Sequence, residues 1–157
     1  MYAIAAGMSD GLGFQNNTRA SWYHSISSAS HLYSADSRIT AYAVIITRGL
    51  AELTCIGTAY GASPLTFLGL AGVGDLFLTC SSSNSRNYTV GYRLGRGESL
   101  DDIVKTLGSV AEGVPTAKGA KMIIDELGIN ALIATSVSRV QLSQIMICSW
   151  SSDETGL

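Results

Sequence analysis

The residues most able to do chemistry lie in one short stretch, LAGVGDLFLTCSSSNSRNYTVG, at 70–91. Asp75 is a single acid among glycines, and Ser85-Arg86-Asn87 follows it. A guanidinium binds phosphate oxygens through two parallel hydrogen bonds and stays charged, and serine and asparagine can add further bonds. A carboxylate among glycines can approach a small substrate closely and accept hydrogen bonds from its hydroxyls.

Each of these residues also has a purely structural interpretation. Asp75 can belong to a helix N-cap at Gly74-Asp75-Leu76, because acids are favoured there. Arg86 can be a solvated surface arginine, and Ser85 and Asn87 are common turn residues. The stretch therefore defines a candidate phosphate site without proving one.

Two neighbouring features concern a cofactor. Glu112, in SVAEGVPTA, is predicted between two helices, where it can accept a bond from a ribose or an amide, or can begin the next helix. The glycines of 69–74 read G-x-x-G-x-G, which is the wrong order for a dinucleotide-binding loop, and no strand pattern precedes them. We therefore do not interpret 69–74 as a Rossmann fingerprint.

Histidine and cysteine suggest no metal site. His24 and His31 lie seven residues apart without a third ligand nearby. Cys55, Cys80 and Cys148 are odd in number and lack close partners, which argues against a disulfide framework and favours a reducing compartment. Cys80 is predicted to be a small buried hydrophobe, because no histidine base is near it in sequence.

Composition restricts the classes of partner. The chain has 157 residues, the size of one domain, with 14% charged and 46% hydrophobic residues. So apolar a composition suggests a surface covered by a second domain or subunit. The net charge of −2, without basic runs, argues against nucleic acid or an anionic membrane as partner. No apolar run reaches the roughly 18 residues of a membrane span.

Apolar periodicity and capping residues predict a mainly α-helical bundle. Apolar residues recur at alternating spacings of four and three, which predicts a helix over 46–61 with Gly61 as its stop. Ser63-Pro64 begins a short helix to Leu68, after which glycines interrupt. Further helices are expected over 99–108, capped by Ser99 with Asp102, and over 115–128, closed by Gly128. No strand-like alternation of any length is present.

Two segments do not fit this pattern. Residues 21–43 are Ser-rich and have neither a helical nor a strand period, so we interpret them as an atypical insertion in an otherwise single helical domain of residues 1–157. Residues 134–157 are also Ser-rich, and we expect a divergent, frayed tail there.

The order of these features resembles the C-terminal domain of NAD(P)-dependent glycerol-3-phosphate dehydrogenase of the bacterial and organellar type. The matching blocks cover most of residues 2–20 and 44–130. They read YAIAAGMSDGLGFQNNTRA, ITRGLAELTCIGTAYGASPLTFLGLAGVGDLFLTCSSSNSRNYTVGYRLGRGESLDDI and SVAEGVPTAKGAKMIIDELGI. The resemblance implies a helical fold like the 6-phosphogluconate dehydrogenase C-terminal domain. It also implies an oxidoreductase that interconverts glycerol 3-phosphate and dihydroxyacetone phosphate for phospholipid-precursor and carbohydrate metabolism.

The same resemblance implies roles for particular residues. In the G-D-L motif, Asp75 matches the carboxylate on the substrate side, and Thr79 matches a hydroxyl that lines the same pocket. In the S-R-N motif, Ser85, Arg86 and Asn87 are expected to hold the substrate phosphate, and Arg86 also to touch the cofactor. Val110 and Glu112 occupy the V-x-E-G block, which implies contact with the dinucleotide.

The sequence departs from the family pattern in ways that bear on activity. The resemblance implies a lysine general base just before the YAIAAG block and a Rossmann domain that binds NAD or NADP, and residues 1–157 contain neither. We therefore expect a fragment or misassembled gene product that supplies the substrate part of a homodimer in the cytoplasm or plastid stroma, inactive alone. The alternative is a catalytically dead phosphate-binding or dimerisation module.

Overall fold

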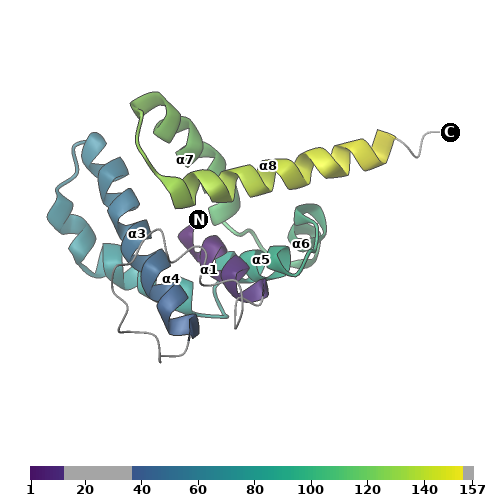
Figure 1. The fold of residues 1–157 in the computed structure, drawn as a ribbon, viewed down its shortest axis with the longest axis horizontal. Coiled ribbons are helices and arrows are strands. Elements are labelled where there is room, and N and C mark those ends of the chain that lie inside the picture. The colour runs from purple at the N-terminus through teal and green to yellow at the C-terminus, as the bar shows by residue number, and fades with distance from the viewer. Residues whose placement is uncertain (13–36, 154–157) are drawn as a thin grey trace.

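The computed structural model describes residues 1–12 and 37–153, and within them helices are the regular elements, with no strand (Figure 1). The mainly α prediction is confirmed. The elements are α1 (Tyr2–Gly11), α3 (Ser37–Ala59), η1 (Pro64–Leu68), η2 (Leu70–Gly74), α4 (Asp75–Ser81), α5 (Arg86–Gly95), α6 (Leu100–Thr106), α7 (Gly113–Leu127) and α8 (Leu132–Asp153).

Helices α1 and α5 pack with their backbones in direct contact. A Cβ built on Gly91 of α5 would lie 1.9 Å from the Ile4 carbonyl oxygen, and one built on Gly7 of α1 would lie 2.0 Å from that of Tyr88. Gly11 and Gly95 repeat the contact one turn further along each helix. Only glycine permits so close an approach, so this pair of helices has little freedom to shift.

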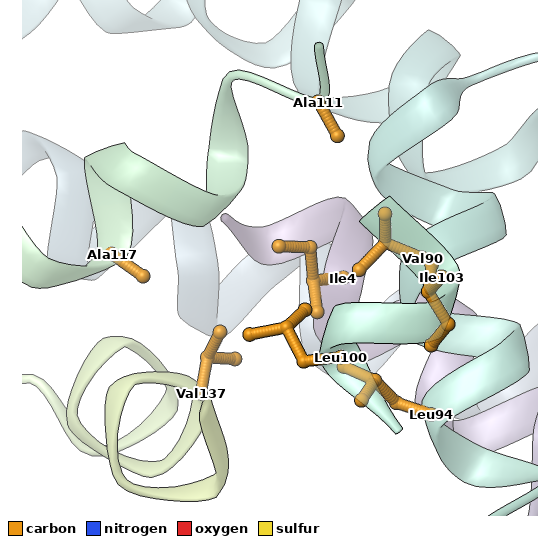
Figure 2. Close-up of a cluster of buried hydrophobic side chains, with 8 residues drawn as sticks. All are labelled: Ile4, Val90, Leu94, Leu100, Ile103, Ala111, Ala117 and Val137. Atoms are coloured by element: carbon orange, nitrogen blue, oxygen red, sulfur yellow. The ribbon is translucent and has the colours of Figure 1, made fainter. Parts of the chain in front are cut away.

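A hydrophobic cluster extends from this contact (Figure 2). Ile4 and Val90, one from each helix, are fully buried and point toward one another. Leu100 and Ile103 of α6 and Val137 of α8 close the cluster around them. The paired helices α1 and α5 therefore form the floor on which α6 and α8 pack.

A buried carboxylate joins α3 to α8. Glu52 is only 1% exposed, and its carboxylate accepts hydrogen bonds from the backbone N–H of Ile133 (3.0 Å) and of Ala134 (3.2 Å) in the first turn of α8. The Arg48 guanidinium, one turn earlier on α3, donates a third bond at 3.2 Å. A buried charge is tolerated only when it is paired and hydrogen-bonded, and the N-terminus of a helix favours a negative charge.

The helices predicted from periodicity and caps are confirmed. Residues 46–59 lie in α3, and Gly61 after its end has a φ of 84°. The Ser99 hydroxyl accepts a bond from the Asp102 N–H at 3.2 Å at the start of α6. Helix α7 ends at the left-handed Gly128.

Two expectations about the irregular segments are wrong where the structure describes them. Residues 37–43, assigned to the insertion, form the first turns of α3; residues 21–36 lie outside the described residues. The tail expected to fray from 134 is helical through Asp153, and α8 runs out beyond the other helices (Figure 1). The many serines of this segment obscured its helical periodicity in the sequence. Ala134, Val137 and Gln141 nevertheless recur on one buried face.

Gly69 ends η1 with an extended backbone, as expected, but Gly72 and Gly74 do not interrupt the helical structure that follows. Leu70–Gly74 form a π-helical turn that leads directly into α4. Gly72 is required there, because a Cβ at that position would lie 2.1 Å from the Phe67 carbonyl oxygen. In this arrangement η1 packs against the π-helical turn, which continues into α4.

None of the helices within the described ranges is both long and apolar enough to cross a membrane.

Glycine substitutions should distinguish a steric clash at the helix contact from the ordinary stabilisation of a helix when alanine replaces glycine. Gly91→Ala places a methyl group against the Ile4 backbone, and we expect it to lower the free energy of unfolding by about 3 kcal/mol. Gly119→Ala is the matched control, because a Cβ there meets nothing within 4 Å, and it should stabilise α7 by about 0.5–1 kcal/mol. Urea denaturation measures both; equal effects would contradict the contact.

The buried Glu52 carboxylate leads to a second testable prediction. Glu52→Ala leaves two N–H groups of α8 and the Arg48 Nε–H without their acceptor, so we expect a loss of about 3 kcal/mol in the free energy of unfolding. Glu126→Ala, at an exposed position of α7, should change it by less than about 0.5 kcal/mol. Thermal melts followed by circular dichroism would refute the role of Glu52 if both variants melted alike.

Candidate functional site

The S-R-N motif forms the N-terminus of α5. Ser85 is the N-cap, with extended backbone, and its hydroxyl oxygen accepts a bond from the Tyr88 N–H at 3.4 Å. Arg86 and Asn87 are the first two residues of the helix. The free N–H groups and the dipole at such a terminus attract anions, which suits a phosphate.

Asn87 ties this terminus to the start of α7. Its Oδ1 accepts a hydrogen bond from the Gly113 N–H at 2.8 Å. A Cβ on Gly113 would lie 2.6 Å from that same oxygen, so glycine is needed for the approach. Because the amide oxygen is used in this bond, the NH2 group of Asn87 is the part that can donate to a ligand.

The Arg86 side chain reaches across to the segment before α7. Its Nη1 donates to the Val110 carbonyl oxygen at 3.1 Å. This bond holds an exposed guanidinium in one place while Nε and Nη2 retain donors for an anion. The guanidinium thus contacts the segment before α7 and still has donors left for an anion.

A cavity of about 390 Å³ lies between α4, the N-terminus of α5 and the loop before α7. A small phosphorylated metabolite fits a volume of this order. Its lining residues are Leu78, Thr79, Ser82, Asn84, Ser85, Arg86, Asn87, Val110 and Glu112.

The cavity brings together most, but not all, of the residues singled out from sequence. Thr79, the S-R-N motif, Val110 and Glu112 line it, whereas Asp75 does not. Asp75 is the first residue of α4, exposed, and Gly74 is the N-cap of that helix. Thr79 lies one turn later and donates its hydroxyl proton to the Asp75 carbonyl oxygen at 2.8 Å.

Three lining residues were missed by sequence reasoning. Ser82 and Asn84 belong to the turn between α4 and α5, and their serine-rich context indicated only a turn. Leu78 is 66% exposed at the rim, and nothing in the sequence distinguishes it from a core leucine. Glu112, for which two roles were open, is the N-cap of α7 and also lines the cavity.

Cys80 follows Thr79 on α4 and is buried in a hydrophobic cluster, as expected. Burial raises the pKa of its thiol to about 11, with a smaller increase from Asp75. Cys55 is an exposed free thiol on α3. Within 1–12 and 37–153, no three His, Cys, Asp or Glu side chains cluster closely enough to hold a metal ion.

Within the described residues, helices without strands and a cavity at the N-terminus of one helix define an all-α domain rather than an α/β dinucleotide-binding domain. The chain belongs to the family described as NAD-dependent glycerol-3-phosphate dehydrogenase C-terminus, whose model matches residues 28–148. That match extends the resemblance beyond its expected end near residue 130.

Relatives and a solved structure agree with this assignment. Proteins named glycerol-3-phosphate dehydrogenase NAD(P)+ from Leptospira biflexa and Geobacillus thermodenitrificans are each 46% identical, over 86% and 82% of this chain. They are covered over 34% and 31% of their own length. A crystal structure of glycerol-3-phosphate dehydrogenase from Coxiella burnetii is similar with a TM-score of 0.71 at 29% identity, over 89% of this chain and 36% of that one. The chain thus spans about a third of the length of these proteins.

The two described thiols should differ sharply in reactivity. At pH 8 Cys55 should alkylate readily, whereas burial and a raised pKa leave Cys80 as an inaccessible thiol. We expect labelling of Cys80 to be at least about 100-fold slower in the folded chain and to become comparable in guanidinium chloride. Mass spectrometry of the digested peptides separates the cysteines, and fast labelling of Cys80 in the folded chain would contradict the structure.

Proposed function

We propose that this chain is the substrate-binding part of an NAD(P)-dependent glycerol-3-phosphate dehydrogenase, an oxidoreductase that interconverts glycerol 3-phosphate and dihydroxyacetone phosphate. The observation that carries the proposal is the position of Arg86. It stands at the N-terminus of a helix, held by Val110, in a cavity of the right size. The names of the relatives supply the substrate and the cofactor.

In this proposal the phosphate binds at the start of α5. Arg86 donates from Nε and Nη2, Asn87 donates from its NH2 group, and the helix dipole adds a favourable field. The glycerol end then extends toward Thr79, with Asp75 one turn beyond it on α4. Fixing the phosphate in this way orients the secondary hydroxyl for oxidation.

The opposite wall of the cavity suits NAD or NADP. The Glu112 carboxylate can accept a bond from a ribose hydroxyl or an amide, the Val110 carbonyl oxygen is an acceptor beside it, and Arg86 lies within reach of both walls. When bound, the nicotinamide supplies the hydride acceptor for the substrate carbon. The residues of this chain hold and orient the two ligands at the shared cavity.

The proton acceptor is proposed to come from outside residues 1–157. The first lysine of the sequence is Lys105, and no lysine lines the cavity in the described part of the chain. Removing a general base alone typically lowers a rate by about 10²–10⁴-fold. We therefore propose that this chain binds substrate without turning it over.

We further propose a homodimer in a reducing compartment, either the cytoplasm or the plastid stroma. Exposed leucines support a covered surface, since Leu65, Leu68 and Leu70 are 74%, 62% and 89% exposed around η1 and η2. The free thiols of Cys55 and Cys80 support reducing conditions. The second candidate, a binding or dimerisation module without catalysis, keeps the same phosphate site.

Isothermal titration calorimetry with glycerol 3-phosphate tests the site. Arg86→Ala removes the charged donors and should weaken binding by about 10- to 100-fold. Arg96→Ala, an exposed arginine at the other end of α5, is the matched control and should bind like the unmodified chain. Absence of binding by the unmodified chain, or an equal loss in both variants, would contradict the proposal.

A spectrophotometric assay decides between the enzyme part and the catalytically dead module. The chain is mixed with NAD+ or NADP+ and glycerol 3-phosphate, and absorbance at the reduced-cofactor band is followed. We expect no turnover by the chain alone and turnover when a partner polypeptide supplies the cofactor domain and the base. Turnover by the chain alone would contradict the proposed division of roles, and no turnover even with that partner would favour the module.

A further inference from the structure

One carboxylate and two phenols meet where α1, α3 and α5 come together. Asp10 of α1 accepts a hydrogen bond from the Tyr42 hydroxyl of α3 at 2.5 Å through its Oδ2, and a second, short one from the Tyr88 hydroxyl of α5. The two phenol oxygens are 3.2 Å apart. All three side chains are half-buried, and none of them lines the cavity.

Asp10 occupies a position that is unfavourable for an acid. It is the penultimate residue of α1, where the carbonyl end of the helix dipole repels a negative charge. The two phenol donors compensate, because hydrogen bonds to an ionised acceptor are stronger than neutral ones. Residues that break a local rule and are compensated in this way are concentrated at sites with a functional demand.

Tyr88 connects this cluster to the phosphate-binding turn. It directly follows Asn87, and its backbone N–H donates to the Ser85 hydroxyl, closing the cap of α5. Its ring end is held by Asp10 at the same time. One residue therefore links the cap at the cavity to a carboxylate on another helix.

The phenols of Tyr42 and Tyr88 stay protonated, as their hydrogen bonds to Asp10 require. Burial, and then the bond to Asp10, raise the pKa of Tyr42 and Tyr88 above that of an ordinary tyrosine. Both hydroxyls therefore remain donors throughout the neutral pH range. No proton has to move for the cluster to hold the turn.

We propose that Asp10 is a positioning residue for phosphate binding, acting through the Tyr88 phenol to hold Ser85, Arg86 and Asn87 in their binding arrangement. This inference rests on the proposed function of the S-R-N turn. Asp10 does not touch the ligand. The first turn of α5 is thus held by two hydrogen bonds to other segments, that of Tyr88 to Asp10 and that of Asn87 to Gly113.

The test combines ligand binding with local amide exchange in the full 157-residue chain. Asp10→Asn keeps the shape and removes the charge, and Tyr88→Phe removes one phenol donor with a smaller effect on folding. Both should raise the Kd for glycerol 3-phosphate by about tenfold. Tyr92→Phe, one turn further along α5 at an exposed position, is the matched control and should leave the Kd unchanged. The Asp10→Asn/Tyr88→Phe double variant should bind no worse than either single variant, because both substitutions disrupt the same Tyr88–Asp10 hydrogen bond.

Hydrogen exchange separates positioning from general destabilisation. Positioning predicts faster exchange at the Tyr88 and Thr89 amides, in the first turn of α5, with little change in its later turns. A merely structural role predicts a uniform increase along α5 and an unchanged Kd while the chain remains folded, and that result would overturn the proposal. If the unmodified chain binds but both variants bind equally well, this inference fails alone. If the unmodified chain does not bind, the proposed function fails and this role with it.

Discussion

The backbones of α1 and α5 touch because glycines stand where side chains would otherwise separate the two helices. Gly7 and Gly11 of α1, and Gly91 and Gly95 of α5, each meet the backbone of the other helix at separations that exclude even a methyl group. A contact of this kind fixes both the distance and the relative register of the helices, because a shift along either axis would bring a side chain into the interface. Because this contact fixes the position of α5, it also fixes the N-terminus of that helix and its N-cap residue, Ser85.

The surroundings of the site follow from this contact. The hydrophobic cluster around Ile4 and Val90 brings α6 and α8 onto the paired helices, and the Glu52 carboxylate orients the start of α8. Asn87 then meets the first residue of α7. The cavity is therefore built from three helix termini that the core holds in place, which is the arrangement expected of a preorganised binding site.

Sequence reasoning was most successful where local rules act alone. Ser99, Gly61 and Gly128 marked helix boundaries correctly because caps and left-handed glycines depend on a few neighbouring residues. The S-R-N motif was chosen as a candidate site from its side-chain chemistry and the family resemblance, and its role stays a prediction. Val110, Glu112 and Thr79 were brought to one cavity with it.

What was missed depends on contacts between distant residues. Glu52 was not singled out from the sequence, because its burial follows only from the position of α8, some eighty residues later. The roles of Asp10 and Tyr42 likewise required three helices to meet. The helix at 132–153 was misread as a frayed tail because its serines hide the apolar face that the core selects.

The most direct test of a preformed phosphate site at the start of α5 is a titration of the ¹⁵N-labelled chain with glycerol 3-phosphate, followed by amide chemical shifts. Arg86, Asn87 and Tyr88 should shift first, together with Gly113, whose N–H is bonded to the Asn87 side chain. Shifts that begin instead at the lysines of α7, Lys118 or Lys121, or that spread evenly over the chain, would contradict the account.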